Sequence, residues 1–292
     1  MCDLFMNILS AVLYVLLAPV VGGLLSGVDR IISARMQRRV GPPLLQPFYD
    51  FFKLWDKEAI AVNRAQRSYI LGFLSFAILA GVFFFAQGDL LLVIFTLTIA
   101  SVCFILAAYC SNSPYSQAGA ERELMQAMAY EPMMLLVAIG FYLKSGSFNV
   151  GTALQEPTMN LLYLPGVFLG LCYVLLIKLR KSPFDISMSH EVHQELIKGL
   201  VTEFSGRTLA LIELAHWYED VMLLGFVYLF FAWAPAWTIV LGLIACAVVF
   251  FSDILVDNCC SRIKWQQMLV STWVVTLVVG FVNILVLMYI RG

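Results

Sequence analysis

The sequence predicts an all-α integral membrane protein with eight transmembrane helices and one amphipathic helix lying in the membrane interface. Three observations favour this fold class. Hydrophobic residues make up 61% of the 292 residues and charged residues only 13%, whereas a soluble domain carries about 25% charged residues. The apolar residues gather in long runs, and most charged residues gather between these runs. A helix that crosses the hydrocarbon core needs roughly twenty mainly apolar residues, and several runs reach that length.

Eight segments qualify as transmembrane helices. They cover approximately residues 4–28, 69–87, 90–110, 124–143, 161–179, 207–232, 236–256 and 267–290. The first is expected to remain as a helix, because Asp3 stands where a secretory signal would carry basic residues. No internal repeat, low-complexity tract or soluble domain is recognisable, so residues 1–292 are expected to form a single membrane domain.

The basic residues predict the orientation of these helices. With eight spans, both termini lie on one side of the membrane and the segments 29–67, 111–123 and 180–206 lie on the other. If those three segments are cytoplasmic, sixteen Lys and Arg residues lie inside, and only Lys144 and Arg291 lie outside. This is the bias of the positive-inside rule, so we expect both termini to be outside.

The first cytoplasmic segment contains a short amphipathic pattern. Pro47 can begin a helix, and the apolar residues that follow it alternate with charged ones. The apolar residues are Phe48, Phe51, Phe52, Leu54 and Trp55, and the charged ones are Asp50, Lys53, Asp56 and Lys57. The pattern is too short and too charged to span the membrane, which favours a helix in the interface. A plain surface anchor is the alternative to a docking role.

Acidic residues inside the predicted helices indicate a functional path, because a charge at bilayer depth costs at least roughly 2.5–3.5 kcal/mol. Glu131 lies about two turns into the fourth helix, before Pro132, which can bend the helix. Glu213, His216 and Asp220 in the sixth helix have i, i+3, i+7 spacing and form one polar stripe. Neighbouring carboxylates and a histidine suit a proton relay. A hydrogen-bonded cluster between helices is the alternative.

Other polar residues carry weaker signals. Asp253 and Asp257, near the end of the seventh helix, are expected to emerge into water beside Arg262. Their spacing also suggests a prenyltransferase, but the sequence has no second acidic cluster of the type that holds Mg²⁺ in such enzymes. His190 and His193 have metal-compatible spacing, which alone is weak evidence for a metal. The seven cysteines include no C-x-x-C, so this chain is not expected to hold zinc or an iron–sulfur cluster by itself.

Three motifs resemble the membrane subunit of respiratory complex I that forms the quinone chamber, and its relatives in energy-converting nickel–iron (NiFe) hydrogenases. The first motif is Arg38-Arg39-Val40-Gly41-Pro42, followed by Gln46, Asp50, Lys53 and Glu58. The second is Ala129-Tyr130-Glu131 in the fourth helix. The third is Lys181-Ser182-Pro183-Phe184-Asp185, followed by Glu191, Glu195, Gly199, Glu203 and Ser205-Gly206.

Departures from the complex I pattern favour the hydrogenase branch. Pro42 and Gln46 are only four residues apart, whereas quinone-reducing members have a longer, glycine-containing stretch there. Lys178 replaces the family's glutamate five residues before the loop proline, and His216 replaces a glutamate of the sixth helix. The stretches 189–195 and 213–219 are most similar to Ech-type hydrogenases.

The resemblance implies a membrane anchor and coupling subunit of a ferredoxin-dependent hydrogenase in a prokaryotic inner membrane. Its catalytic NiFe centre and iron–sulfur clusters would belong to partner subunits, and this chain would hold no cofactor, metal or catalytic residue. The expected partners are the hydrogenase large and small subunits, a ferredoxin-like iron–sulfur subunit and an antiporter-like membrane subunit. The lipid bilayer surrounds the chain, and no nucleic acid is involved.

The intramembrane acids and the resemblance together give three groups of candidate residues. The proton or charge relay consists of Glu123, Glu131, Lys178, Glu213, His216 and Asp220. The acidic coupling loop carries Asp185, Glu191, Glu195 and Glu203. Docking of the peripheral arm is assigned to Arg35, Arg38, Arg39, Gln46, Asp50, Lys53, His190 and His193. The alternatives are a quinone-chamber subunit of a complex I-type dehydrogenase and a secondary ion transporter.

Overall fold

A computed structural model of the chain describes residues 2–58, 63–188, 198–233, 235 and 237–291, and these residues are mainly helical. Its α-helices are α1 (Cys2–Met36), α2 (Gln46–Trp55), α3 (Arg64–Phe85), α4 (Leu90–Tyr109), α5 (Pro114–Ser145), α6 (Val150–Gln155), α7 (Pro165–Lys178), α8 (Gly206–Phe231), α9 (Thr238–Cys259), α10 (Trp265–Val274) and α11 (Val282–Arg291). One 3-10 turn, Asn160–Leu162, precedes α7, and a second, Gly199–Val201, precedes α8. A π-helical segment, Val275–Phe281, joins α10 to α11 into one continuous rod.

Seven of the described helices are long and apolar enough to cross a membrane: α1, α3, α4, α5, α8, α9 and the α10–α11 rod. The eighth, α7, is apolar but has 14 residues. At 1.5 Å per residue it is about 21 Å long, which is shorter than the hydrocarbon core. It begins at Pro165 rather than at residue 161, because proline fits the first turn of a helix and a separate 3-10 turn precedes it.

Two helices extend beyond the apolar runs that predicted them. α5 begins at Pro114, ten residues before the predicted start at 124, so most of the expected loop 111–123 is helical. α1 continues from residue 28 to Met36. The reason is the same in both cases. Charged residues do not belong to an apolar run, but they are compatible with a helix. In α5, Ser113 before the helix and Pro114 at its first position also favour a helix start there.

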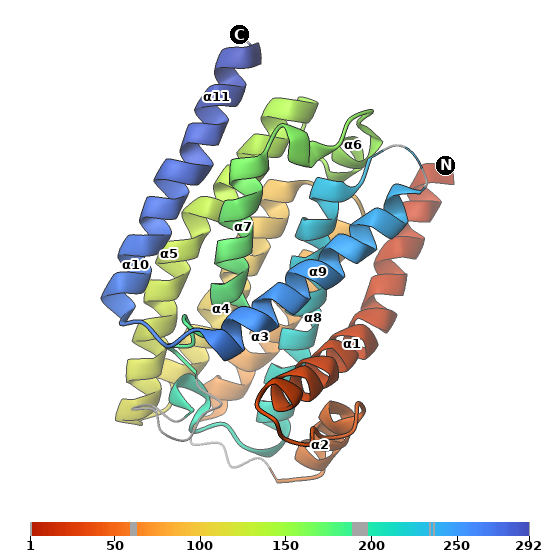
Figure 1. Cartoon of the computed structure of the whole chain (residues 1–292). Helices are drawn as coiled ribbons and strands as arrows, with labels where there is room; N and C mark the ends of the chain where they lie inside the picture. Colours follow the sequence, from red (N-terminus) through yellow and green to blue (C-terminus); the bar gives the residue numbers. More distant parts are fainter. Residues whose placement is uncertain (1, 59–62, 189–197, 234, 236, 292) are drawn as a thin grey trace.

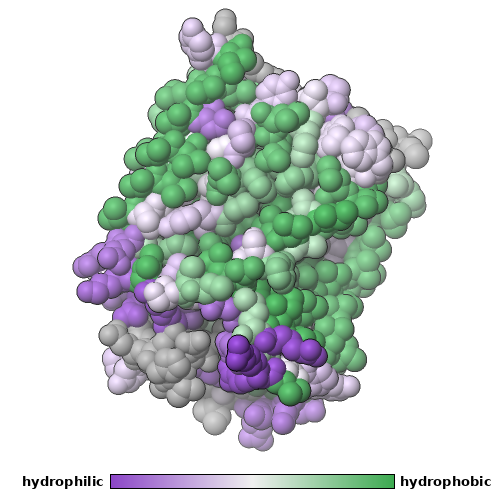
Figure 2. Space-filling view, viewed as in Figure 1, coloured by the Kyte–Doolittle hydropathy of each residue, from purple (hydrophilic) through white to green (hydrophobic). Residues whose placement is uncertain are grey.

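The bundle has two unlike ends (Figure 1). Both termini lie at one end with α6, whereas α2 and the described ends of the segment between α7 and α8 lie at the other. Hydrophobic residues cover most of the visible surface, and the hydrophilic ones gather mainly toward the α2 end (Figure 2). Large apolar side chains such as Leu16, Val248 and Val278 are more than 60% exposed. A lipid environment accounts for these surfaces, as in a multi-pass membrane protein.

Three segments that connect the helices meet at the α2 end through two glycines. A Cβ atom on Gly119 of α5 would lie 2.3 Å from the backbone nitrogen of Leu200. A Cβ atom on Gly206 would lie 2.5 Å from the carbonyl oxygen of Glu58, and the backbone φ of Gly206 is +54°. Only glycine permits such close approach. The chain after α2, the start of α5 and the segment before α8 are therefore packed together, which positions the site described next.

Candidate functional site

Polar side chains from α4, α5, α8 and the end of α7 meet inside the bundle, near the α2 end. We call this group the charge cluster. It consists of Ser101, Glu123, Tyr130, Lys178, Arg180, Ser187, His216 and Glu219. Glu123 is 7% exposed and Glu219 is 5% exposed. Buried ionised groups require partners, and the members of the cluster supply them to one another.

Glu123 links the loop after α7 to the membrane helices. Arg180 Nη2 donates to Glu123 Oε1 at 3.2 Å, and the Ser187 hydroxyl donates to Glu123 Oε2. Arg180 and Ser187 both belong to the segment that follows α7. A displacement of this segment would therefore change the hydrogen bonds of a carboxylate inside α5.

His216 lies between a cation and an anion. Arg180 Nη1 lies 2.7 Å from His216 Nε2 and 3.0 Å from His216 Nδ1, and His216 Nδ1 lies 3.3 Å from Glu219 Oε2. A guanidinium can only donate and a carboxylate can only accept. A neutral imidazole can therefore accept from Arg180 on its unprotonated nitrogen, and a proton on Nδ1 would be directed at Glu219. The rings of Phe73 and Phe104 pack edge-to-face on the imidazole, at 5.4 and 5.5 Å between centroids.

Lys178 completes the cluster on the α4 side. Its Nζ atom donates to Ser101 Oγ at 3.0 Å and lies 4.4 Å from the centroid of the Tyr130 ring. The Tyr130 hydroxyl is 3.2 Å from the same Ser101 oxygen. The ammonium is thus held by a hydroxyl and a cation–π contact and has no direct carboxylate partner among the described residues.

An unusual helix end places Arg180 in the cluster. The Arg180 N–H donates to the carbonyl of Ile177 at 3.1 Å, and the Lys181 N–H donates to that of Leu176 at 2.9 Å. This is the Schellman pattern, in which the residue after the cap adopts a left-handed conformation and is usually glycine. Here Arg180 takes that position with φ of +53°. The strained backbone turns the arginine back toward Glu123 and His216.

A second set of ion pairs ties the loop after α7 to α1 and α9. Lys181 contacts Asp29 of α1 and lies 3.5 Å from Asp257 of α9. The Ser182 N–H also donates to Asp257, at 2.7 Å. Burial disfavours the charged form of Lys181, but Asp29 and Asp257 outweigh this effect and raise its pKa above the ordinary value.

The prediction that Asp253 emerges into water is wrong. Asp253 is 3% exposed, and its Oδ2 atom has no hydrogen-bond partner among the described residues. The reason is that α9 continues to Cys259, so that Asp253 lies well inside the helix. Asp257 is partly exposed but bonded to Lys181 and Ser182, whereas Arg262 pairs with Asp185.

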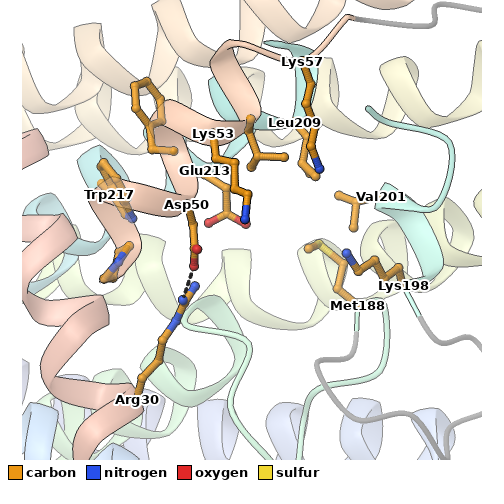
Figure 3. A pocket seen from close by; sticks show the side chains of 13 residues that line it. Arg30, Asp50, Lys53, Lys57, Met188, Lys198, Val201, Leu209, Glu213 and Trp217 are labelled. Carbon is orange, nitrogen blue, oxygen red and sulfur yellow. Dashed lines mark hydrogen bonds and ion pairs between the residues drawn. The ribbon is translucent and has the colours of Figure 1, made fainter. Parts of the chain in front are cut away.

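A cavity of about 320 Å³ lies behind α2 (Figure 3). Its walls come from α1, α2 and the chain just after it, α8, and the described ends of the segment between α7 and α8. The residues that line it are Arg30, Pro47, Asp50, Phe51, Lys53, Leu54, Lys57, Met188, Lys198, Val201, Leu209, Glu213 and Trp217. Arg30 donates to Asp50 at 2.7 Å, and Gln46 donates to Asp50 at 2.9 Å. The first bond fastens α2 to α1, whereas the second lies within α2 and orients the Asp50 carboxylate. Glu213 lies one helical turn before His216.

The sequence profile of the family described as NADH dehydrogenase matches residues 8–288 of this chain. The chain belongs to the NADH dehydrogenase family. The resemblance to the complex I membrane subunit and its hydrogenase relatives is thereby confirmed.

Individual relatives include components of hydrogenases and of quinone oxidoreductases. Hydrogenase-4 component C of Escherichia coli is 29% identical over 81% of this chain and 79% of its own length. Formate hydrogenlyase subunit 4 of the same organism is 27% identical, over 84% of each chain. A component of the NADH-quinone oxidoreductase of Geobacillus kaustophilus is 27% identical over 99% of this chain and 94% of its own length.

A solved structure extends the likeness to the whole fold. A chain of the membrane-bound sulfane sulfur reductase, an archaeal respiratory membrane complex, superposes with a TM-score of 0.86 and 25% identity. The match covers 96% of this chain and 99% of the archaeal one. This member of the NADH dehydrogenase family is therefore a membrane subunit of a complex I-like complex.

The predicted relay residues of this family member do not all lie together. Glu123, Lys178 and His216 belong to the charge cluster, whereas Glu213 lines the cavity. Asp220, the residue that follows Glu219 in the sequence, is half-buried. The predicted stripe on α8 is thus divided between the cavity and the interior.

Glu131 lies apart from the charge cluster, on the outer side of α5. It is half-buried and continues a stripe of outward-facing residues that includes Leu124, Met128 and Ile139. It forms no hydrogen bond or ion pair with any residue that the structure describes. A carboxylate in this position faces either lipid or a neighbouring membrane subunit.

The predicted docking and loop residues are also dispersed. Arg35, Arg38 and Arg39 are exposed at the end of α1, and Glu203 is half-buried before α8. Asp185 is buried and paired with Arg262. Four predicted residues lie outside the described residues: His190, Glu191, His193 and Glu195. Within the described part of the chain, no three His, Cys, Asp or Glu residues group in a way that could hold a metal ion.

The sequence reasoning missed several members of the charge cluster, namely Ser101, Tyr130, Arg180, Ser187 and Glu219. Glu219 had a usable signal, because it lies three residues after His216 and therefore on a neighbouring face of the same helix. Arg180 and Ser187 had none, because their positions depend on the path of an irregular segment.

Proposed function

We propose that this chain is the membrane anchor and coupling subunit of a ferredoxin-dependent, energy-converting NiFe hydrogenase, linking redox chemistry to H⁺ or Na⁺ translocation. The hydrogenase large and small subunits and a ferredoxin-like iron–sulfur subunit would dock at the α2 end and carry the NiFe centre and the clusters. An antiporter-like subunit would contact the chain within the membrane. The likeness to hydrogenase-4 component C and formate hydrogenlyase subunit 4 supports this assignment.

The observation that carries the proposal is the connection between the loop after α7 and the charge cluster. Arg180 and Ser187 bond to Glu123, and Arg180 also bonds to His216. A redox reaction above the membrane changes charge near this loop. Two unit charges about 8 Å apart interact by roughly 2 kcal/mol at an effective dielectric of 20. That energy changes a protonation equilibrium by more than tenfold, which is enough to bias a relay.

The arrangement supports a direction for proton movement. Glu213 faces the cavity, His216 lies one turn further along α8, and Glu219 Oε2 lies 3.3 Å from the imidazole. A proton entering through the cavity would reach Glu219 through the imidazole once Arg180 moves away and leaves a ring nitrogen free to accept it. In this scheme Glu131, on the outer side of α5, passes the change to the neighbouring membrane subunit. The positive-inside bias assigns the α2 end to the cytoplasm and the termini to the outside.

Purification of the intact complex tests this function. The chain is isolated from its native membranes in a mild detergent, and the sample is analysed for nickel, iron and hydrogen evolution from reduced ferredoxin. Co-purification of nickel and iron with ferredoxin-dependent hydrogen evolution is the expected result. Iron without nickel, or a lone metal-free chain, contradicts the hydrogenase assignment.

A quinone-chamber subunit of a complex I-type dehydrogenase is the second candidate. The cavity behind α2 and the nearly full-length likeness to the NADH-quinone oxidoreductase component of Geobacillus kaustophilus favour it. Inhibition of the purified complex by quinone analogues, together with electron transfer to an added quinone, distinguishes this candidate from the hydrogenase.

A further inference from the structure

We propose that the cavity behind α2 binds the phosphate headgroup of an anionic phospholipid drawn from the adjacent leaflet. The proposal concerns the cavity alone and does not depend on the redox reaction of the complex. It rests on three features: the depth at which α2 lies, the excess of cationic side chains around the cavity, and the apolar walls below them.

The outer face of α2 sets the depth of the cavity. Tyr49, Phe52 and Trp55 are respectively 60%, 62% and 42% exposed, and they lie at successive turns of the helix. Aromatic residues of an amphipathic helix sit at the level of the lipid headgroups. The opposite face of α2, with Pro47, Asp50 and Leu54, lines the cavity. The cavity is therefore at the depth where phosphate groups are present in the leaflet.

The charge of the cavity wall favours an anion. Four cationic and two anionic side chains line it, which gives a formal charge of +2. Arg30 is paired with Asp50, whereas Lys53, Lys57 and Lys198 form no ion pair with any residue that the structure describes. Lys53 extends from α2, with Glu213 beside it, Lys57 extends from the chain just after α2, and Lys198 extends from the facing wall (Figure 3).

The remaining wall suits the apolar part of a lipid. Phe51 and Leu54 of α2, Leu209 and Trp217 of α8, and Met188 and Val201 supply apolar surface beside the lysines. A phosphate between Lys53 and Lys198 would leave the glycerol and the first methylene groups against this surface. A zwitterionic choline headgroup would add a cation to an already cationic wall. A neutral quinone ring would leave the lysines without a counter-charge.

Lipid selectivity of the intact complex tests the proposal. The complex is reconstituted in phosphatidylcholine nanodiscs that contain a small amount of spin-labelled phosphatidylglycerol or spin-labelled phosphatidylcholine. Electron paramagnetic resonance then measures the motionally restricted fraction of each label. We expect restriction of phosphatidylglycerol, and about a tenfold loss of its preference over phosphatidylcholine in the K53Q/K198Q variant, because near-surface lysines attract anionic lipid. The K264Q variant is the matched control, since Lys264 is exposed at the start of α10 and does not line the cavity.

A cavity-filling variant separates the cavity from general surface attraction. Leu209→Trp keeps all the lysines but fills the space, so it should abolish the restricted phosphatidylglycerol signal while the complex still assembles. Four outcomes overturn the proposal. The first two are equal restriction of both labelled lipids, and a loss of phosphatidylglycerol preference in K264Q equal to that in K53Q/K198Q. The other two are displacement of the labelled lipid by millimolar inorganic phosphate, and its displacement by a quinone analogue while K53Q/K198Q keeps the preference unchanged. The last two would identify a free-phosphate site and a quinone site, respectively.

Discussion

Arg180 Nη1 lies 2.7 Å from His216 Nε2, so a residue of the loop after α7 contacts the imidazole inside α8. The same guanidinium bonds to Glu123 of α5 at 3.2 Å. Arg180 therefore connects two membrane helices to the segment that lies at the α2 end of the bundle. Loss of this single side chain would remove the contact of the loop with His216, whereas Ser187 would still bond to Glu123.

Replacement of Arg180 tests its dual role in charge and backbone geometry. R180A should destabilise the chain by about 3–5 kcal/mol, because Glu123 is left buried without its ion pair. R180G should be less destabilising than R180A by about 1 kcal/mol, because glycine adopts the left-handed conformation at low cost. Thermal unfolding of the detergent-solubilised complex measures both. Adding E123Q should recover part of the lost stability, and no recovery would contradict the pairing.

Replacement of His216 tests proton transfer within the charge cluster. H216Q keeps a group that can accept from Arg180 and donate to Glu219, but it cannot exchange protons. Ion uptake per hydrogen evolved should fall by about tenfold or more in proteoliposomes, with assembly retained. H216A is the comparison, because it also leaves a space between Phe73 and Phe104 and should lower thermal stability. Unchanged coupling in H216Q would exclude His216 from the relay.

Much of the bundle was predictable because hydrophobic length is a local property of the sequence. The apolar runs identified the spanning helices, and the amphipathic pattern after Pro47 identified α2. The ends were less accurate, since the charged residues that begin α5 and end α1 are compatible with a helix but not with an apolar run.

The charge cluster could be predicted only in part. Its helical members His216 and Lys178 were recognisable as polar groups inside apolar segments. Arg180 was not, because its place depends on a left-handed residue where sequence rules expect glycine. The helical spacing could not decide whether Glu219 or Asp220 is the partner of His216, because residues three and four positions apart both lie within reach on the same helix.

The contact between α1 and α2 should depend on pH through Asp50. Burial raises the pKa of this carboxyl, but the hydrogen bonds from Arg30 and Gln46 and the nearby charges outweigh burial and lower the pKa overall. A lowered folded-state pKa means that the stabilisation is fully present above the unfolded value of about 3.9 and is lost as the pH falls through the folded value. Hydrogen exchange of the 46–55 peptide should therefore be constant near neutral pH and increase only in acid. D50N should show weaker protection at neutral pH and no such acid dependence, and an unchanged profile would argue against this ion pair.

Glu131 offers the most direct test of coupling to a neighbouring membrane subunit. Its carboxylate is half-buried on the outer side of α5 and has no partner among the described residues. A charge in such a place is costly unless another subunit supplies a partner. E131Q removes the charge with little change in shape, so hydrogen evolution should continue while ion uptake falls by about tenfold or more. Glu121 on the same helix is exposed near the α2 end, which makes E121Q the matched control with coupling retained. Equal coupling in E131Q and E121Q would remove Glu131 from the path, and loss of the antiporter-like subunit from E131Q would instead assign it to assembly.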